Sequence, residues 1–138
     1  MDLYGEIILD HYKNPRHKGS LKNPDLSAEG QNPLCGDGIR IDIKINAKGK
    51  IEDIYFDGQG CAISQASASM LTEKILGKNK KDIQKLKNKD ILQMLNIPLS
   101  PSRIKCALLP LEVLKKVRKP PASKASGNGE LIPKFQTK

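Results

Sequence analysis

Three cysteines lie where a thiol could do chemistry rather than only fill a core. Cys35 lies in NPLCGDGIRI, Cys61 follows two closely spaced glycines in DGQGCAISQASAS, and Cys106 lies in SPSRIKCALLP. We place each at or near the end of an expected element, where backbone amides point outward and thiols ionise readily. A free cysteine can also be a small core residue. A glycine or a cation beside each one favours three ligands over three core residues.

The residues around the cysteines fit one shared site. Glycines follow Cys35 and precede Cys61, and they would let the backbone come close to whatever the sulfurs hold. The small side chains after Cys61 would let a helix lie close to a sheet and keep that thiol near Cys35. Arg103 and Lys105 flank Cys106 and would favour its thiolate.

Asp37 is a fourth candidate ligand, two residues after Cys35 and just before an expected strand. An aspartate in that place can also be a turn residue that bonds its own backbone. Three sulfurs and one oxygen would complete either a tetrahedral zinc site or a two-iron cluster, which needs two protein ligands per iron. A hard carboxylate holds such metals less tightly than a fourth thiolate would, so this set suits temporary holding.

The elements that must position these groups begin with a hairpin. Isoleucines alternate with polar residues over 39–46, the pattern of a half-buried strand. Residues 47–50 are a turn, and 51–56 return as a second strand. This predicts an antiparallel sheet with one wet face.

The first third of the chain holds one expected helix and one expected loop. Residues 2–13 form a helix that ends at Asn14-Pro15. Its apolar side chains share one face: Leu3, Ile7, Ile8 and Tyr12. The segment 15–34 has little periodicity and is expected to be an extended loop.

Three further helical stretches follow the hairpin. Residues 61–76 form a helix that Gly77 ends, and 80–95 is helical with a break near Asn88. Residues 100–117 begin well with a serine and a proline.

Pro110 lies inside this last pattern, so the helix is either kinked there or begins near it. The composition of 119–138 is that of a flexible basic tail, which leaves one domain over 1–118. The expected fold class is α+β, with a small antiparallel sheet of about three strands and helices packed on one of its faces.

Bulk composition narrows the class of protein. The chain has 138 residues, a net charge of +9 and no tryptophan, which fits one domain with an aliphatic core. The lysines cluster at 78–89 and 115–124 with no aromatic residues between them, and no nucleic-acid-binding signature is present. We expect neither a signal peptide nor a membrane span, and a cytoplasmic location where thiols stay reduced.

Together these motifs resemble those of a known family. The three cysteine segments resemble those of the U-type iron–sulfur assembly scaffolds, the family of IscU, SufU and the N-terminal domain of NifU. The opening YGEIILDHYKNPRHKG resembles the N-terminal signature of that family. The resemblance runs from about Tyr4 to Val117, and it implies the SufE/IscU-like sandwich fold.

The resemblance implies a scaffold protein rather than an enzyme. Such a scaffold receives sulfur from a cysteine desulfurase, binds iron, assembles a labile [2Fe-2S] cluster and passes it to apo-proteins. Carried over, Cys35, Cys61 and Cys106 are the cluster ligands, Asp37 promotes release, and Cys106 or Cys35 accepts the persulfide sulfur. Zinc can occupy the same site, and the N-terminal helix is expected to dock the desulfurase or to self-associate as a homodimer or homotrimer.

Two departures from the family pattern leave an alternative open. The IscU branch has a histidine before its third cysteine, whereas this chain has Lys105, as in the SufU branch. SufU proteins carry an insertion of about 20 residues between the second and third cysteines, a difference that surface loops tolerate. The 45-residue spacing here is the short, IscU-like one. The alternative function is a zinc-dependent sulfur acceptor that activates a SufS-type desulfurase without assembling a cluster.

The remaining polar candidates have simpler interpretations. His11 is expected to be a packing or hydrogen-bonded residue of the first helix rather than a ligand, and His17 to be solvated in a basic loop. Ser64, Ser67 and Ser69 have no histidine in a motif beside them, so we expect small packing residues rather than nucleophiles.

Overall fold

The computed structural model describes residues 3–32 and 36–119. Cys35 therefore lies outside the described residues, as does the expected tail beyond Lys119. The described part holds three strands and five helices, in the order α1 (Leu3–Lys13), β1 (Leu26–Asn32), β2 (Asp37–Ile45), β3 (Ile51–Gln59), α2 (Ala62–Ile75), α3 (Lys80–Lys85), α4 (Asn88–Leu95) and α5 (Pro101–Lys115).

The sheet is antiparallel in the order β1-β2-β3, which confirms the predicted hairpin. Ile41 pairs with Phe56 and Ile43 with Ile54, so the apolar alternation of both strands falls on one face. The two strands extend beyond the apolar pattern, from Asp37 and to Gln59, because the backbone ladder continues through polar residues and glycine. This extension brings the start of β2 beside the end of β3.

The third strand, β1, was not located by the sequence, which predicted a loop over 15–34. Its residues LSAEGQN have no apolar alternation, and none of them is fully buried. Two neighbours hold it: Ala28 pairs with Ile41 of β2, and the α5 side chain of Val113 packs so close to Gly30 that a Cβ there would lie 2.9 Å from it. Tertiary pairing, rather than strand propensity, makes this segment a strand.

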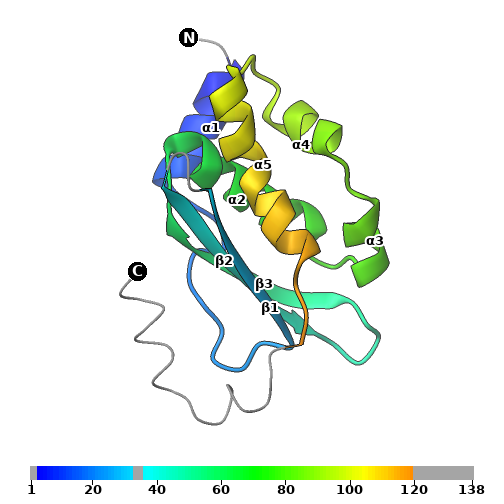
Figure 1. Ribbon diagram of the computed structural model, residues 1–138. Coiled ribbons are helices and arrows are strands. Elements are labelled where there is room, and N and C mark those ends of the chain that lie inside the picture. Colours follow the sequence, from blue (N-terminus) through cyan, green and yellow to red (C-terminus); the bar gives the residue numbers. More distant parts are fainter. Residues whose placement is uncertain (1–2, 33–35, 120–138) are drawn as a thin grey trace.

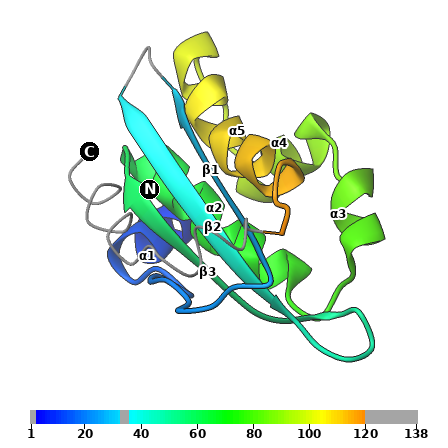
Figure 2. The same cartoon turned by 60° about the horizontal axis from the view of Figure 1, so that its bottom comes forward.

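Helices α2 and α5 lie side by side on the isoleucine face of the sheet (Figures 1 and 2). Both contribute fully buried side chains to one aliphatic core with β2 and β3. Helix α1 packs against α2, while α3 and α4 pack outside α5. The predicted α+β architecture, with helices on one face, is confirmed.

The predicted apolar face of α1 was partly wrong. Among the α1 side chains that the structure describes, Ile8 and His11 are buried, whereas Ile7 and Tyr12 are 36% and 45% exposed. The side chain of Leu3, also predicted on this face, lies outside that described set. Helix α1 makes its main contacts with one other helix, α2, so only a narrow stripe of it is covered. Side chains one step around the helix from that stripe therefore face outward.

The predicted breaks within the helical segments are confirmed. Gly77 follows α2 with φ at +87°, which suits a glycine after a helix end. The helical stretch 80–95 divides before Asn88, and a capping box between Asn79 and Asp82 starts α3. Helix α5 runs through Pro110, so the possibility that it begins there is wrong.

His17 is not solvated as the sequence predicted. Its ring is partly buried, its Nδ1 lies 3.2 Å from Thr72 Oγ1 on α2, and its carbonyl accepts a 2.9 Å hydrogen bond from the Phe56 amide. The segment around it pairs with the outer edge of β3, which a loop composition does not reveal. Among the described residues, no helix is both long and apolar enough to cross a membrane.

Candidate metal centre

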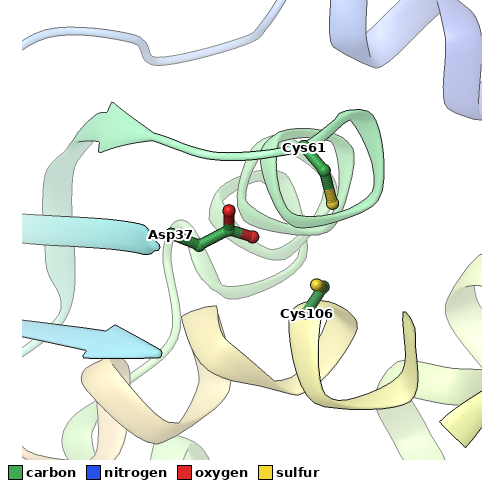
Figure 3. A group of neighbouring side chains, drawn as sticks. All are labelled: Asp37, Cys61 and Cys106. Atoms are coloured by element: carbon green, nitrogen blue, oxygen red, sulfur yellow. The ribbon is translucent and has the colours of Figure 1, made fainter. Parts of the chain in front are cut away.

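Three of the four predicted ligands converge on one point (Figure 3). One carboxylate oxygen of Asp37 and the sulfurs of Cys61 and Cys106 all lie within 4.8 Å of one another. They come from the start of β2, the residue before α2 and the second turn of α5. The fourth predicted ligand, Cys35, lies outside the described residues.

Cys61 is held by the turn between β3 and α2. It is the N-cap residue of α2, in an extended conformation, and its side chain makes no capping bond. Its carbonyl accepts hydrogen bonds from the Gln65 amide at 3.0 Å and from Ser64 Oγ at 3.1 Å. The backbone of Cys61 is therefore fixed, while its half-buried thiol points toward Cys106 (Figure 3).

Cys106 is positioned by the packing of α5 on α2. Its side chain is 5% exposed and lies on the face of α5 that contacts α2. The sequence predicted Cys106 at or near the end of an element, and its place in the second turn of α5 confirms that prediction. Because Cys61 is the N-cap residue of α2, the contact between the two helices sets the distance between the two sulfurs.

Asp37 is the residue of this group whose environment most clearly favours a bound ligand. Its side chain is 5% exposed, and its Oδ2 has no hydrogen-bond partner among the described residues. A buried carboxylate oxygen without a partner costs free energy that a native fold normally avoids. A bound cation would supply the missing partner, so the residues present fit a metal.

The donor spacing also fits a metal. Two thiolates that share one tetrahedral zinc lie about 3.8 Å apart, given a zinc–sulfur length of about 2.3 Å. The observed limit of 4.8 Å needs only a small closure to reach that geometry. Two soft sulfurs and one hard oxygen suit zinc and iron, and they fill three of the four positions of a tetrahedral ion.

Other candidates from the sequence are structural. Ser64, Ser67 and Ser69 are fully buried and hydrogen-bonded within the fold, which confirms the packing interpretation. His11 is also a buried, hydrogen-bonded residue, as expected, because its Nδ1 lies 2.8 Å from Ser69 Oγ. Arg103 and Lys105 are exposed, and their predicted effect on the Cys106 thiolate stays a prediction.

Sequence reasoning missed one polar contact near the site. Gln65 is buried one turn after Cys61, where its Oε1 accepts a 3.1 Å hydrogen bond from Lys18 Nζ. Its Nε2 lies 3.5 Å from the Gly58 carbonyl, at the end of β3. The sequence feature that could have indicated this contact is Gln65 itself, a long polar side chain within a run of mostly small residues. This contact joins the turn before Cys61 to α2.

Comparison with known proteins finds similar sequences over nearly all of the described residues. The sequence profile of the NifU-like N terminal domain matches residues 3–121. The zinc-dependent sulfurtransferase SufU of Bacillus subtilis (strain 168) is 39% identical over 131 aligned positions, which cover 83% of this chain and 88% of SufU. The iron–sulfur cluster assembly scaffold protein IscU of Escherichia coli (strain K12) is 39% identical over 115 positions, covering 81% and 88%.

A solved structure is similar in fold as well as in sequence. The crystal structure of FiSufU from Fervidobacterium islandicum AW-1, described as an iron–sulfur cluster assembly scaffold for the SUF system, superposes with a TM-score of 0.68 at 31% identity. The match covers 80% of this chain and 92% of FiSufU. The alignment with the Bacillus SufU has more positions than the part of this chain that it covers, so SufU has residues that this chain lacks.

Proposed function

The chain belongs to the NifU-like N-terminal domain family, and from that premise we propose that it is a scaffold for iron–sulfur cluster assembly. It receives sulfur from a cysteine desulfurase, binds iron, assembles a labile [2Fe-2S] cluster and transfers that cluster to apo-proteins. The proposed ligands are Cys35, Asp37, Cys61 and Cys106. The assignment of Cys35 rests on the sequence motif alone.

One observation carries this proposal: the buried Oδ2 of Asp37 has no partner, and it lies beside two thiols from distant parts of the chain. A fold that needed only packing at this point would gain by replacing that carboxylate with an apolar side chain. The unpaired oxygen supports a role for Asp37 as a ligand to a cation.

Sulfur transfer would proceed by thiol–persulfide exchange on one of the proposed cysteines. The thiolate of Cys106 or Cys35 attacks the outer sulfur of the desulfurase persulfide, a new S–S bond forms, and the desulfurase thiolate leaves. Converting the resulting persulfide to sulfide takes two electrons, which an external thiol or electron-transfer protein must supply. The sulfide then joins iron held by the same ligands.

Asp37 determines how firmly the product is held. A carboxylate is a harder ligand than a thiolate and binds iron in a cluster less tenaciously. With one oxygen among three sulfurs, the assembled cluster is retained weakly enough to pass to an acceptor. Asp37 is therefore proposed to promote release rather than assembly.

A second function is favoured by a specific observation. Lys105 occupies the position before the third cysteine where the resembling IscU branch has histidine, and one relative is named a zinc-dependent sulfurtransferase. In this reading the four ligands hold zinc, and one thiolate leaves the metal to accept sulfur when the desulfurase docks. The residues that SufU has and this chain lacks count against it.

Anaerobic reconstitution with iron and sulfide separates the two functions. The scaffold proposal expects a visible chromophore that transfers to an apo-ferredoxin, together with iron in the reconstituted protein. The sulfur-acceptor proposal expects about one zinc per chain in freshly isolated protein and faster desulfurase turnover, without a transferable chromophore. Protein with neither metal nor chromophore would contradict both, as would full tolerance to the loss of all three cysteines.

A further inference from the structure

Gly60, the residue between the end of β3 and Cys61, has a steric role that its backbone does not explain. Its φ lies outside the left-handed range, so an L side chain is compatible with the backbone there. Gly58 differs, because its φ is +142° and a Cβ would overlap the Gly38 carbonyl. What requires glycine at position 60 is therefore the space beside it.

Two neighbours of the site fill that space. A Cβ on Gly60 would overlap Ser64 Oγ, and it would lie 3.2 Å from Cγ and 3.3 Å from Oδ2 of Asp37. The first contact is impossible without movement, and the other two are tighter than ordinary van der Waals contact. Gly60 thus lets Ser64 and the unpaired oxygen of Asp37 approach the same point.

Ser64 is in turn tied to the next ligand. Its side chain is fully buried, and its hydroxyl donates to the Cys61 carbonyl at 3.1 Å. If an added methyl group pushed Ser64 away, that hydrogen bond would break and the first turn of α2 would shift. If it pushed Asp37 instead, the carboxylate would turn away from the sulfurs.

We propose that Gly60 and Ser64 are positioning residues that together set the separation between the Asp37 carboxylate and the Cys61 thiol. The inference rests on the proposed function, since it concerns the same ligand group. Neither residue is itself a ligand: Ser64 fixes the backbone of Cys61, and Gly60 leaves room for Ser64 and Asp37 at once. Residues that contact the ligands without binding the metal commonly tune metal affinity in this way.

The test is a double-mutant cycle read by cobalt binding. Co²⁺ is titrated anaerobically into the full-length metal-free protein, thiolate–cobalt absorption is recorded, and Zn²⁺ competition gives the zinc affinity. Gly60→Ala is expected to weaken binding about 100-fold and Ser64→Ala about 10-fold, the range found for groups outside the ligand shell. The double variant should bind more tightly than Gly60→Ala alone and approach Ser64→Ala, because alanine at position 64 removes the overlapping atom and leaves only the milder contacts with Asp37.

Ser69→Ala provides the matched control, since Ser69 is a buried serine of the same helix that faces α1 rather than the site. Gly60→Ala combined with Ser69→Ala should stay as weak as Gly60→Ala alone. Thermal unfolding of each metal-free variant separates lost binding from lost folding. If Gly60→Ala does not fold, Ser64→Ala, which only removes an atom, still has to weaken binding.

The outcomes distinguish this inference from the function on which it rests. Wild-type protein that binds Co²⁺ and assembles a cluster, with Gly60→Ala and Ser64→Ala unchanged in affinity, overturns the inference and leaves the function standing. Equal affinity of the two double variants would also overturn it, because Ser64 would then not be the group displaced. Wild-type protein that binds no metal and assembles no cluster overturns the function, and the inference with it.

Discussion

The hydroxyl of Ser67 on α2 donates a 2.7 Å hydrogen bond to the carbonyl of Ala107 on α5, the residue that follows Cys106. This contact joins the helix that begins after Cys61 to the helix that carries the other described sulfur. The position of Cys106 therefore depends in part on how α5 packs against α2.

Ser67→Ala is expected to lower the free energy of unfolding by about 1–3 kcal/mol, since it leaves the buried Ala107 carbonyl without that donor. Urea unfolding of the metal-free protein measures the change. Ser102→Ala, an exposed serine of the same α5 helix, is the control and should change stability little. Equal stability of the two variants would show that the Ser67 bond does not hold the helices together.

Asp37→Asn is expected to stabilise the metal-free protein by about 1–3 kcal/mol, because it removes the charge from a buried oxygen without a partner. The comparison is Asp42→Asn. Asp42 is also buried, but its carboxylate accepts hydrogen bonds from the Leu21 amide, Ser27 Oγ and Arg40 Nε. That variant should be less stable than wild type. Unfolding curves that show Asp37→Asn destabilised would mean that the carboxylate serves the fold and not a ligand.

Asp37→Ala should slow cluster transfer to an apo-ferredoxin and lengthen the lifetime of the assembled cluster. A change on the order of tenfold is expected, since outer groups that tune a metal site already act on this scale. The decay of the visible chromophore and the appearance of holo-ferredoxin give the two rates. Transfer as fast as in the parent protein would remove Asp37 from the release step.

Cys61→Ser and Cys106→Ser should each weaken zinc binding by more than the roughly 10- to 100-fold that changes outside the ligand shell cause. Each replaces a thiolate ligand, and a hydroxyl binds zinc poorly. Competition with a metal indicator measures the affinity. Asp57→Asn, a part-buried carboxylate on β3 outside the ligand group, is the control and should bind normally. A serine variant with wild-type affinity would place the metal elsewhere.

Stability should also depend on pH through His11. Burial lowers the pKa of His11 below its ordinary value of 6.5, and Arg16 acts in the same direction, whereas Glu73 and Asp10 oppose it. The unfolded chain then binds a proton at a pH where the folded protein does not. The contribution of neutral His11 to the free energy of unfolding is fully present above about pH 6.5. It is lost as the pH falls below that value toward the pKa of His11 in the folded protein. Urea unfolding between about pH 5 and 8 should show this loss.

The control for this prediction is His11→Asn, whose side-chain oxygen can still accept a hydrogen bond from Ser69. The Arg16 amide already donates to Ser69 Oγ, which leaves the serine hydroxyl to donate to Nδ1 of the neutral imidazole. The variant should show a flatter pH dependence over the same range. An unchanged slope would assign the effect to another group. Asp10, whose pKa is lowered chiefly by its hydrogen bond from Arg16, titrates at lower pH.

The sequence was sufficient to predict those features that depend on local pattern. Alternating isoleucines identified the central strand, and the break near Asn88 followed from local composition. The residue types and neighbours of the cysteines and Asp37 predicted a shared ligand group, and Asp37, Cys61 and Cys106 do lie together. Local signals worked because strand faces, helix ends and ligand chemistry are decided within a few residues of each position.

The rest depended on contacts between distant segments. β1 is a strand because β2 and α5 hold it, and Ile7 and Tyr12 are exposed because α1 makes its main contacts with one helix. The convergence of Asp37, Cys61 and Cys106 likewise requires a strand end, a helix start and the second turn of another helix to meet, and only packing between them fixes those distances. The reason for glycine at position 60 could be seen only once Ser64 and Asp37 were placed beside it. The residue types indicated which chemistry was possible. The packing of α2 against α5 and the sheet brought the carboxylate and the two thiols together.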